Sequence, residues 1–175
     1  MTEPMKHTTD NAFTGPLKGG ANEPTYSGAL SFMRRRYTRE LTGVDADRSI
    51  QLGIRTVAPE TCGIEVVAAG EIDDIGIGGF AERIRERVGE ASAYLTFDID
   101  CLDPAFAPGT GTPVAGGLSS REALGVLRGL GTIDFVGGDV VEVAPPYDNA
   151  DITAVAASTV AMYYLGLLAE RRAGG

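Results

Sequence analysis

Short apolar segments with the character of β-strands alternate with helical segments along most of this 175-residue chain. The pattern predicts strands over residues 49–55, 64–68, 93–98 and 135–143, and helices over 80–88, 121–130 and 151–172. Ser119 or Ser120 is expected to cap the second helix. This alternation favours an α/β fold, in which crossover helices flank a parallel sheet. Four strands make a small sheet for such a fold, which suggests that part of a larger architecture is absent.

The first 44 residues differ in composition from the rest of the chain. Residues 1–28 are polar and interrupted by Pro and Gly, and a basic helical segment is expected over residues 30–41. We therefore predict an N-terminal arm over residues 1–44, partly disordered, and an α/β domain over residues 45–175. The basic segment either binds an anion or, more commonly, forms a solvated face or contacts an acidic subunit; its arginines are Arg34, Arg35, Arg36 and Arg39.

Charge and cysteine content narrow the range of functions. A formal net charge of −9 argues against nucleic acid or an anionic membrane surface as the main partner. Cys62 and Cys101 are too few for a disulfide framework, and no signal peptide is recognisable, so we expect a cytoplasmic protein. Residues 152–169 are uncharged but rich in Ala, Ser, Thr and Gly. This composition favours a core helix or a subunit contact over a membrane span.

Two aspartates spaced two residues apart stand at the end of the predicted strand 93–98. Alternate residues of a strand point to the same side, so Asp98 and Asp100 should project together. Ligands of open α/β sheets bind beyond the carboxyl ends of the strands, and carboxylate oxygens suit hard cations such as Mg²⁺, Mn²⁺ or Ca²⁺. Alternatively, these aspartates and Asp103 hold the following Gly/Pro loop through backbone N–H groups.

Two other carboxylate motifs fit less well. An EF-hand loop beginning at Asp98 would need glycine at its sixth position and a glutamate where Gly109 stands. An Asp-x-Asp phosphotransferase would use the first aspartate as a nucleophile, but Cys101 and Leu102 fit that motif poorly and no partner lysine is obvious. Cys101 itself is expected to be a small packed residue, since no histidine lies near it in sequence.

Longer segments around the aspartates resemble a known family. The segments are SIQLGIRT (residues 49–56), FDIDCLDPAFAPGTGTPVAGGLSSREAL (97–124) and VGGDVVEVAPPYDNADITAVAA (136–157). Over residues 45–170 the chain resembles the C-terminal half of the ureohydrolases, the arginase/agmatinase family, and the agmatinase branch is nearest. The resemblance implies a truncated form of the three-layer α/β/α arginase fold.

The resemblance also implies a reaction. Family members use two Mn²⁺ ions to activate water, which hydrolyses a linear guanidino compound such as agmatine to urea and an amine, a step of polyamine metabolism. By this resemblance Asp98 and Asp100 are metal ligands and Glu142 binds the guanidinium group of the substrate. Thr110 and Thr112 lie in the loop that forms the wall of the site.

The chain departs from the family at the other metal ligands. Family members also use a histidine and an Asp-x-His-x-Asp motif, whereas the single histidine here is His7, and the family's His-Gly segment aligns with Ser27 and Gly28. Mn²⁺ binds weakly in the divalent series, so two carboxylates predict weak or no binding of one ion. We therefore expect an isolated chain without activity.

Two hypotheses follow from the incomplete ligand set. The chain is an agmatinase-like hydrolase whose missing ligands come from another chain, in a homo-oligomer or a hetero-oligomer. Alternatively, it is a non-catalytic truncated paralogue or subunit that associates with full-length relatives. In either case we expect no membrane partner and an exposed strand edge where the first half of the sheet is missing.

Overall fold

The computed structural model describes residues 45–57, 61 and 63–174. The predicted N-terminal arm, with its basic segment, His7 and the Ser27–Gly28 segment, lies outside the described residues, as does Cys62.

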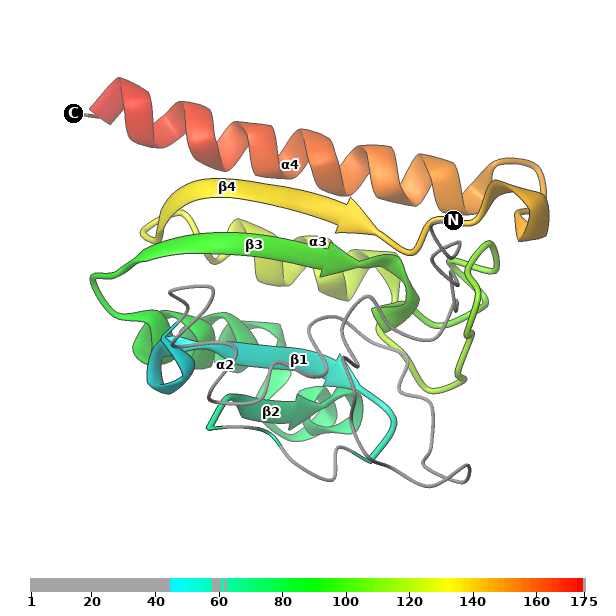
Figure 1. The fold of residues 1–175 in the computed structure, drawn as a ribbon, viewed down its shortest axis with the longest axis horizontal. Helices are drawn as coiled ribbons and strands as arrows, with labels where there is room; N and C mark the ends of the chain where they lie inside the picture. The colour runs from blue at the N-terminus through cyan, green and yellow to red at the C-terminus, as the bar shows by residue number, and fades with distance from the viewer. Residues whose placement is uncertain (1–44, 58–60, 62, 175) are drawn as a thin grey trace, which may run out of the picture.

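All four predicted strands are present, with ends shifted by at most a few residues. They are β1 (Ile50–Ile54), β2 (Glu65–Ala68), β3 (Ser92–Asp98) and β4 (Asp134–Val141). They form two separate parallel pairs rather than one sheet, with β1 paired to β2 and β3 paired to β4. Figure 1 shows the four strands running in the same direction, in the spatial order β4, β3, β1, β2. The prediction of parallel strands is confirmed, while the single continuous sheet is not formed by the described residues.

Three helices flank the strands: α2 (Ile72–Val88), α3 (Ser120–Arg128) and α4 (Ile152–Gly174). Helix α2 begins at Ile72 rather than at the predicted Phe80, with a break at Gly76, where φ is 68°. Residues 72–79 contain three glycines and so have low helix propensity, which is why the sequence pattern did not predict this part of the helix. Phe80, Ile84 and Val88 are all buried, as their spacing of four residues predicted.

The helices cover one face of the strands. Helix α2 contacts β1 and α3, and α4 contacts α3 and β4. On the helical side, Phe135 of β4 packs edge-on against Tyr164 of α4, with ring centroids 5.7 Å apart. Tyr94 and Val136, on β3 and β4, are 60% and 68% exposed. The described residues therefore form two layers of the α/β/α arrangement that the resemblance implies.

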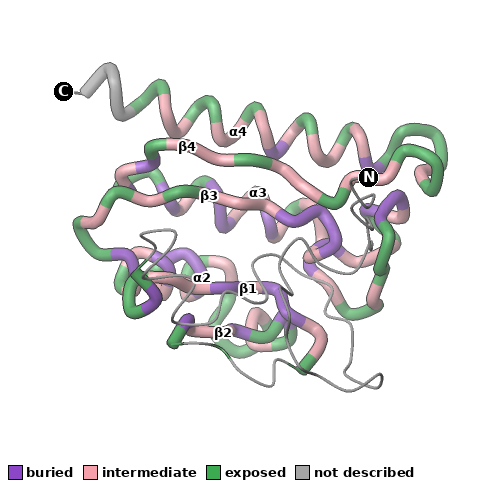
Figure 2. The backbone as a smooth tube through the Cα atoms, in the orientation of Figure 1, coloured by how far each residue is buried: buried purple, intermediate pink, exposed green. Residues whose placement is uncertain are grey.

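The core lies between the strands and the helices. In Figure 2 the buried residues gather along α2, α3 and the segment that follows β3. Its most deeply buried large side chains come from several of these elements and are Val67, Phe80, Ile99, Leu102 and Leu130. Burying such side chains on one side of the strands is the main source of stability.

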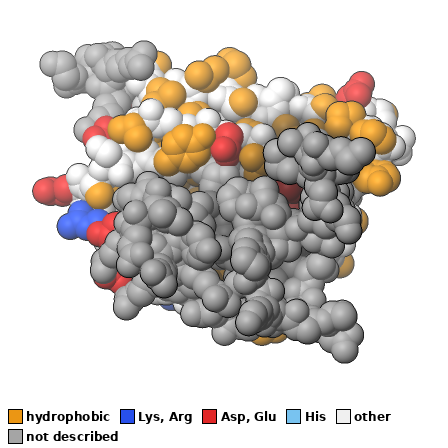
Figure 3. All heavy atoms as spheres, in the orientation of Figure 1, with side chains coloured by type: hydrophobic (Ala, Val, Ile, Leu, Met, Phe, Trp, Pro, Cys, Tyr) orange, Lys and Arg blue, Asp and Glu red, His pale blue; other side chains and the backbone are white. Residues whose placement is uncertain are grey.

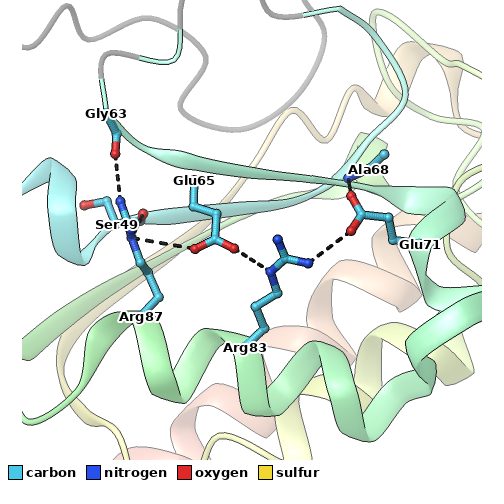
Figure 4. A network of polar contacts seen from close by, with 7 residues as sticks. All are labelled: Ser49, Gly63, Glu65, Ala68, Glu71, Arg83 and Arg87. Carbon is cyan, nitrogen blue, oxygen red and sulfur yellow. Dashed lines mark hydrogen bonds and ion pairs between the residues drawn. The ribbon is translucent and has the colours of Figure 1, made fainter.

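Helix α2 is also tied to the first pair of strands by arginines (Figure 4). Arg83 forms ion pairs with Glu65 of β2 and, at 3.1 Å, with Glu71. Arg87 donates to the carbonyl oxygens of Ser49 and Gly63, at 3.1 and 2.7 Å. These groups are partly exposed, so each ion pair contributes about 1 kcal/mol or less. Their main effect is to fix the position of α2 across β1 and β2.

The uncharged segment after residue 151 forms α4. Its Ile152–Glu170 part is long and apolar enough to cross a membrane by length and composition alone, and 11% of that window is buried. One side of α4 packs against β4 and α3, with Thr153 and Val160 buried, so the helix covers the core without being enclosed in it. Met162 and Leu165 on the other side are 66% and 56% exposed. Figure 3 shows hydrophobic side chains along this edge of the molecule.

Ser119 is the residue that caps α3. Its Oγ accepts a hydrogen bond from Glu122 N at 3.2 Å, and Glu122 Oε2 accepts one from Ser119 N at 2.7 Å. We expect Ser119→Ala to lower the free energy of unfolding by about 1 kcal/mol, because the backbone N–H of Glu122 at the partly buried start of the helix loses its acceptor. Ser158→Ala, on the exposed side of α4, is the control and should change it by about 0.5 kcal/mol or less. Urea denaturation measures both; equal changes would contradict the assigned cap.

Candidate functional site

The two aspartates lie together at the carboxyl end of β3 and are buried, with exposed fractions of 5% for Asp98 and 1% for Asp100. Asp98 ends the strand, and its Oδ1 accepts a hydrogen bond from Asp100 N at 3.0 Å. Asp100 belongs to a 3-10 turn, η4 (Ile99–Cys101), and does not continue the strand. The expectation of strand-like alternation is therefore wrong for Asp100, because Asp98 caps this turn.

The two carboxylate oxygens of Asp100 differ in their hydrogen bonding. Its Oδ2 accepts a hydrogen bond from Thr112 Oγ1 at 2.9 Å. Thr112, which the resemblance places in the loop that forms the wall of the site, therefore contacts Asp100 directly. Asp100 Oδ1 is buried and has no hydrogen-bond partner among the described residues, and the same holds for Thr110 Oγ1. A buried carboxylate oxygen without a donor is costly unless a cation or another donor meets it.

The surroundings of Asp98 oppose its ionisation in the metal-free chain. Desolvation by burial raises the pKa of its carboxyl to about 8, and the negative charges of Asp100 and Glu142 act in the same direction. A divalent cation beside the pair would reverse this effect by favouring the ionised form.

Glu142 stands at the same edge of the strands, directly after β4. It follows Val141, the register partner of Asp98, and its side chain is exposed. Its φ of 63° lies in the left-handed region, which costs a non-glycine residue about 1–3 kcal/mol and is common at functional sites. Asp139, on β4, is exposed and accepts a hydrogen bond from the hydroxyl of Tyr94 at 3.2 Å. We therefore do not assign it to the candidate site.

Two other acidic residues near the site accept hydrogen bonds from backbone N–H groups. Asp103 accepts hydrogen bonds from Ala105 N and Gly116 N, at 2.9 and 2.8 Å, and these lower the pKa of its carboxyl. The loop-holding alternative is therefore correct for Asp103. Asp148 accepts hydrogen bonds from Thr153 N and Ala154 N, both at 3.0 Å, and so holds the first turn of α4.

Cys101 is packed beside the aspartates. A Cβ added to Gly53 would lie 3.2 Å from its Cβ. Burial raises the pKa of the Cys101 thiol, and the charge of Asp98 adds to the effect. The thiol stays protonated at neutral pH, which agrees with the predicted packing role.

The residue that the sequence reading overlooked is Arg55, just after β1. Its guanidinium group donates to the carbonyl oxygens of Asp100 and Val114, the latter at 3.1 Å from Nη2, and to that of Gly53 at 3.0 Å. It thereby joins the end of β1 to the loop that carries both aspartates. Only its place in the SIQLGIRT segment marked it, because its partners lie far away in sequence.

The side chains fit part of the coordination shell of one hard cation. The fit rests on the unpartnered Asp100 Oδ1 and the adjacent Asp98 carboxylate. Across residues 45–57, 61 and 63–174 there is no group of three or more His, Cys, Asp or Glu side chains that could hold a metal ion. The described residues therefore do not fit a complete site for two ions.

A parallel α/β fold with a buried carboxylate pair beyond the carboxyl ends of its strands has polar groups where proteins of this class bind ligands. The Arginase family model matches residues 21–166. An agmatinase of Enterobacter sp. (strain 638) is 46% identical over 155 residues, which cover 87% of this chain and 51% of that protein. An agmatinase of Neisseria meningitidis serogroup C (strain 053442) is 50% identical over 137 residues, covering 78% and 45%.

A solved structure agrees with these relatives. That of a hypothetical agmatinase from Burkholderia thailandensis has a TM-score of 0.76 and 54% identity, and covers 79% of this chain and 45% of that one. The chain therefore belongs to the arginase family. It spans about half the length of the agmatinases it matches, in agreement with the predicted resemblance to one half of them.

Proposed function

We propose that this chain carries the Asp98–Asp100 part of an agmatinase-type Mn²⁺ site. The observation that carries the proposal is the buried, unpartnered Oδ1 of Asp100 beside the Asp98 carboxylate at the carboxyl edge of β3. The family and the agmatinases among its relatives support Mn²⁺ as the cation.

Each residue has a separate role in this proposal. Asp98 and Asp100 bind the cation, and Thr112 orients Asp100. Glu142 binds the guanidinium group of a linear guanidino substrate such as agmatine, since a carboxylate pairs with that planar cation through two parallel hydrogen bonds. When bound, Mn²⁺ would lower the pKa of coordinated water and so supply a nucleophile at neutral pH.

The incomplete donor set limits the isolated chain to cation binding. Two carboxylates hold one Mn²⁺ weakly and cannot hold two adjacent divalent ions. We propose that hydrolysis to urea and an amine, within polyamine metabolism in the cytoplasm, needs further ligands from another chain in an oligomer. The second candidate is a non-catalytic subunit, favoured by the lack of a third metal-ligating group among the described residues.

Mn²⁺ titration followed by electron paramagnetic resonance tests the proposed site. Asp100→Asn should lower Mn²⁺ affinity by more than about tenfold, because a direct ligand loses its charge. Asp74→Asn removes the same charge from an exposed position on α2 and should leave the affinity unchanged. Equal affinities for the two variants would exclude Asp100 as a ligand.

Urea release separates the two candidates. The purified chain with Mn²⁺ should release no urea from agmatine or 4-guanidinobutyrate. Turnover by the chain alone, lost in Asp98→Ala, would overturn the non-catalytic reading.

A further inference from the structure

Among the residues that the structure describes, no strand lies between the two pairs of strands. Strands β1 and β3 run in the same direction and follow one another in the spatial order (Figure 1), yet neither pairs with the other. β1 uses one edge for β2, and β3 uses one edge for β4. No strand of residues 45–57, 61 and 63–174 pairs with the remaining edges of β1 and β3. We call these two edges the inner edges.

The side chains around the inner edges are incompletely buried. Ile50 and Leu52 of β1, and Leu95 and Phe97 of β3, pack against the core but remain only half-buried. Central strands of parallel sheets are normally buried on both faces. Apolar side chains of an added strand would complete this burial.

The two pairs of strands are held in a fixed relation to each other. Helix α2 contacts β1 and also contacts α3, which follows β3 in the chain. At the carboxyl end, Arg55 links β1 to the loop after β3 through the carbonyl oxygens of Asp100 and Val114. An incoming strand therefore meets two edges that are already positioned, which lowers the entropic cost of binding.

We propose that the inner edges accept one parallel strand from a second arginase-family polypeptide, namely from the part of an agmatinase that this chain does not match. This inference rests on the proposed function, because it names the partner that would supply the missing ligands. The agmatinases reported above extend to about twice the matched length, so they contain such a part.

A second copy of the described residues cannot supply this strand. A strand that pairs with both inner edges must have both of its own edges available for hydrogen bonding. Each of the four described strands already uses one edge within its own pair. The added strand must therefore come from chain outside these four strands.

The direction of the inner edges connects the added strand with the candidate site. A strand parallel to β3 has its carboxyl end beside Asp98 and Asp100, where the unpartnered Oδ1 lies. Residues following that strand would reach the cation that the two aspartates bind. The same interaction would thus complete both the sheet and the ligand set.

Hydrogen exchange on the full 175-residue chain tests the proposal in EDTA, so that no metal contributes. The chain is measured alone and after co-expression with the unmatched part of the Burkholderia thailandensis agmatinase. We expect a one-to-one complex by light scattering and at least tenfold slower amide exchange in peptides covering both β1 and β3. Peptides from α3, whose amides already bond within the helix, provide the internal control.

Several results would overturn the proposal. These are the absence of a complex, a complex that protects only β4 or α4, protection that appears on self-association without the second polypeptide, and strong protection of both strands in the chain alone. The Asp98→Asn, Asp100→Asn double variant separates this proposal from the proposed function. This variant should form the complex and protect both strands while losing Mn²⁺ binding. A wrong strand assignment would instead leave the wild-type chain able to bind Mn²⁺ but unable to form the complex.

Discussion

Gly117→Ala is expected to lower the free energy of unfolding by about 3 kcal/mol, because the position leaves no room for a Cβ atom. A Cβ at Gly117 would lie 2.5 Å from Asp103 N, 2.6 Å from Leu102 C and 2.8 Å from Cys101 O. All three are backbone atoms, which cannot rotate away as the end of a side chain could. The loop must therefore move, or the turn after β3 must deform.

The same clash should disturb the candidate site. The loop returns to the turn through two hydrogen bonds, from Asp103 N to Leu118 O at 2.9 Å and from Leu118 N to Cys101 O at 3.0 Å. Any displacement of this contact also moves Asp100, which precedes Cys101. We therefore expect Gly117→Ala to weaken Mn²⁺ binding along with stability.

Gly111→Ala is the matched control, in the same loop. Nothing lies within 4 Å of a Cβ built at Gly111, and its φ is not in the left-handed region. The change should be neutral or slightly stabilising, within about 1 kcal/mol, because alanine restricts the unfolded chain. Urea denaturation of both variants gives the comparison. A Gly117→Ala variant as stable as Gly111→Ala would show that the loop tolerates a side chain there.

The parts of this structure that local patterns determine could be predicted from the sequence. The spacing of Phe80, Ile84 and Val88 indicated the buried side of α2, and the serine pair indicated the start of α3. The apolar run before Asp98 indicated β3. Each of these depends on residues close together in the chain, and periodicity reports such relations directly.

The remaining features depend on contacts between distant segments. Arg55 donates hydrogen bonds to the carbonyl oxygens of Asp100 and Val114. No local sequence pattern predicts these contacts. The separation of β1–β2 from β3–β4 follows from pairing, and the sequence indicates strands but not their neighbours. The turn at Asp100 is local, but it begins where the strand ends: Asp98 Oδ1 accepts a hydrogen bond from Asp100 N, and the alternation pattern did not distinguish this cap from continued strand.

Asp98→Asn is expected to stabilise the metal-free chain at alkaline pH by on the order of 3 kcal/mol. Burial and the neighbouring Asp100 raise the pKa of the Asp98 carboxyl from its ordinary value of 3.8 to about 8. Between these two values the folded chain binds more protons than the unfolded chain. The stability of the wild type should therefore fall as pH rises through this range, and it is regained on acidification. Asparagine removes this dependence because it does not ionise, and its side-chain oxygen can still accept from Asp100 N.

Asp103→Asn is the control with the opposite sign. Backbone hydrogen bonds from Ala105 and Gly116 lower the pKa of Asp103, so its ionised form stabilises the fold above the unfolded-state pKa. Its replacement should destabilise the chain at pH 7, and the difference should vanish as pH falls below the folded-state pKa. Denaturation in EDTA at several pH values measures both variants. A wild type whose stability does not decline between pH 5 and 8, relative to Asp98→Asn, would contradict the buried carboxylate pair.

Adding Mn²⁺ at pH 8 should raise the free energy of unfolding of the wild type and so narrow its deficit relative to Asp98→Asn. The cation favours the ionised pair and so adds binding free energy to the folded wild type, by mass action. Asp98→Asn has lost one carboxylate and should gain little from the same concentration of Mn²⁺. Equal stabilisation of both proteins by Mn²⁺ would place the cation elsewhere on the chain. The repulsion that weakens the metal-free fold at this edge is thus the same property that prepares it to bind a cation.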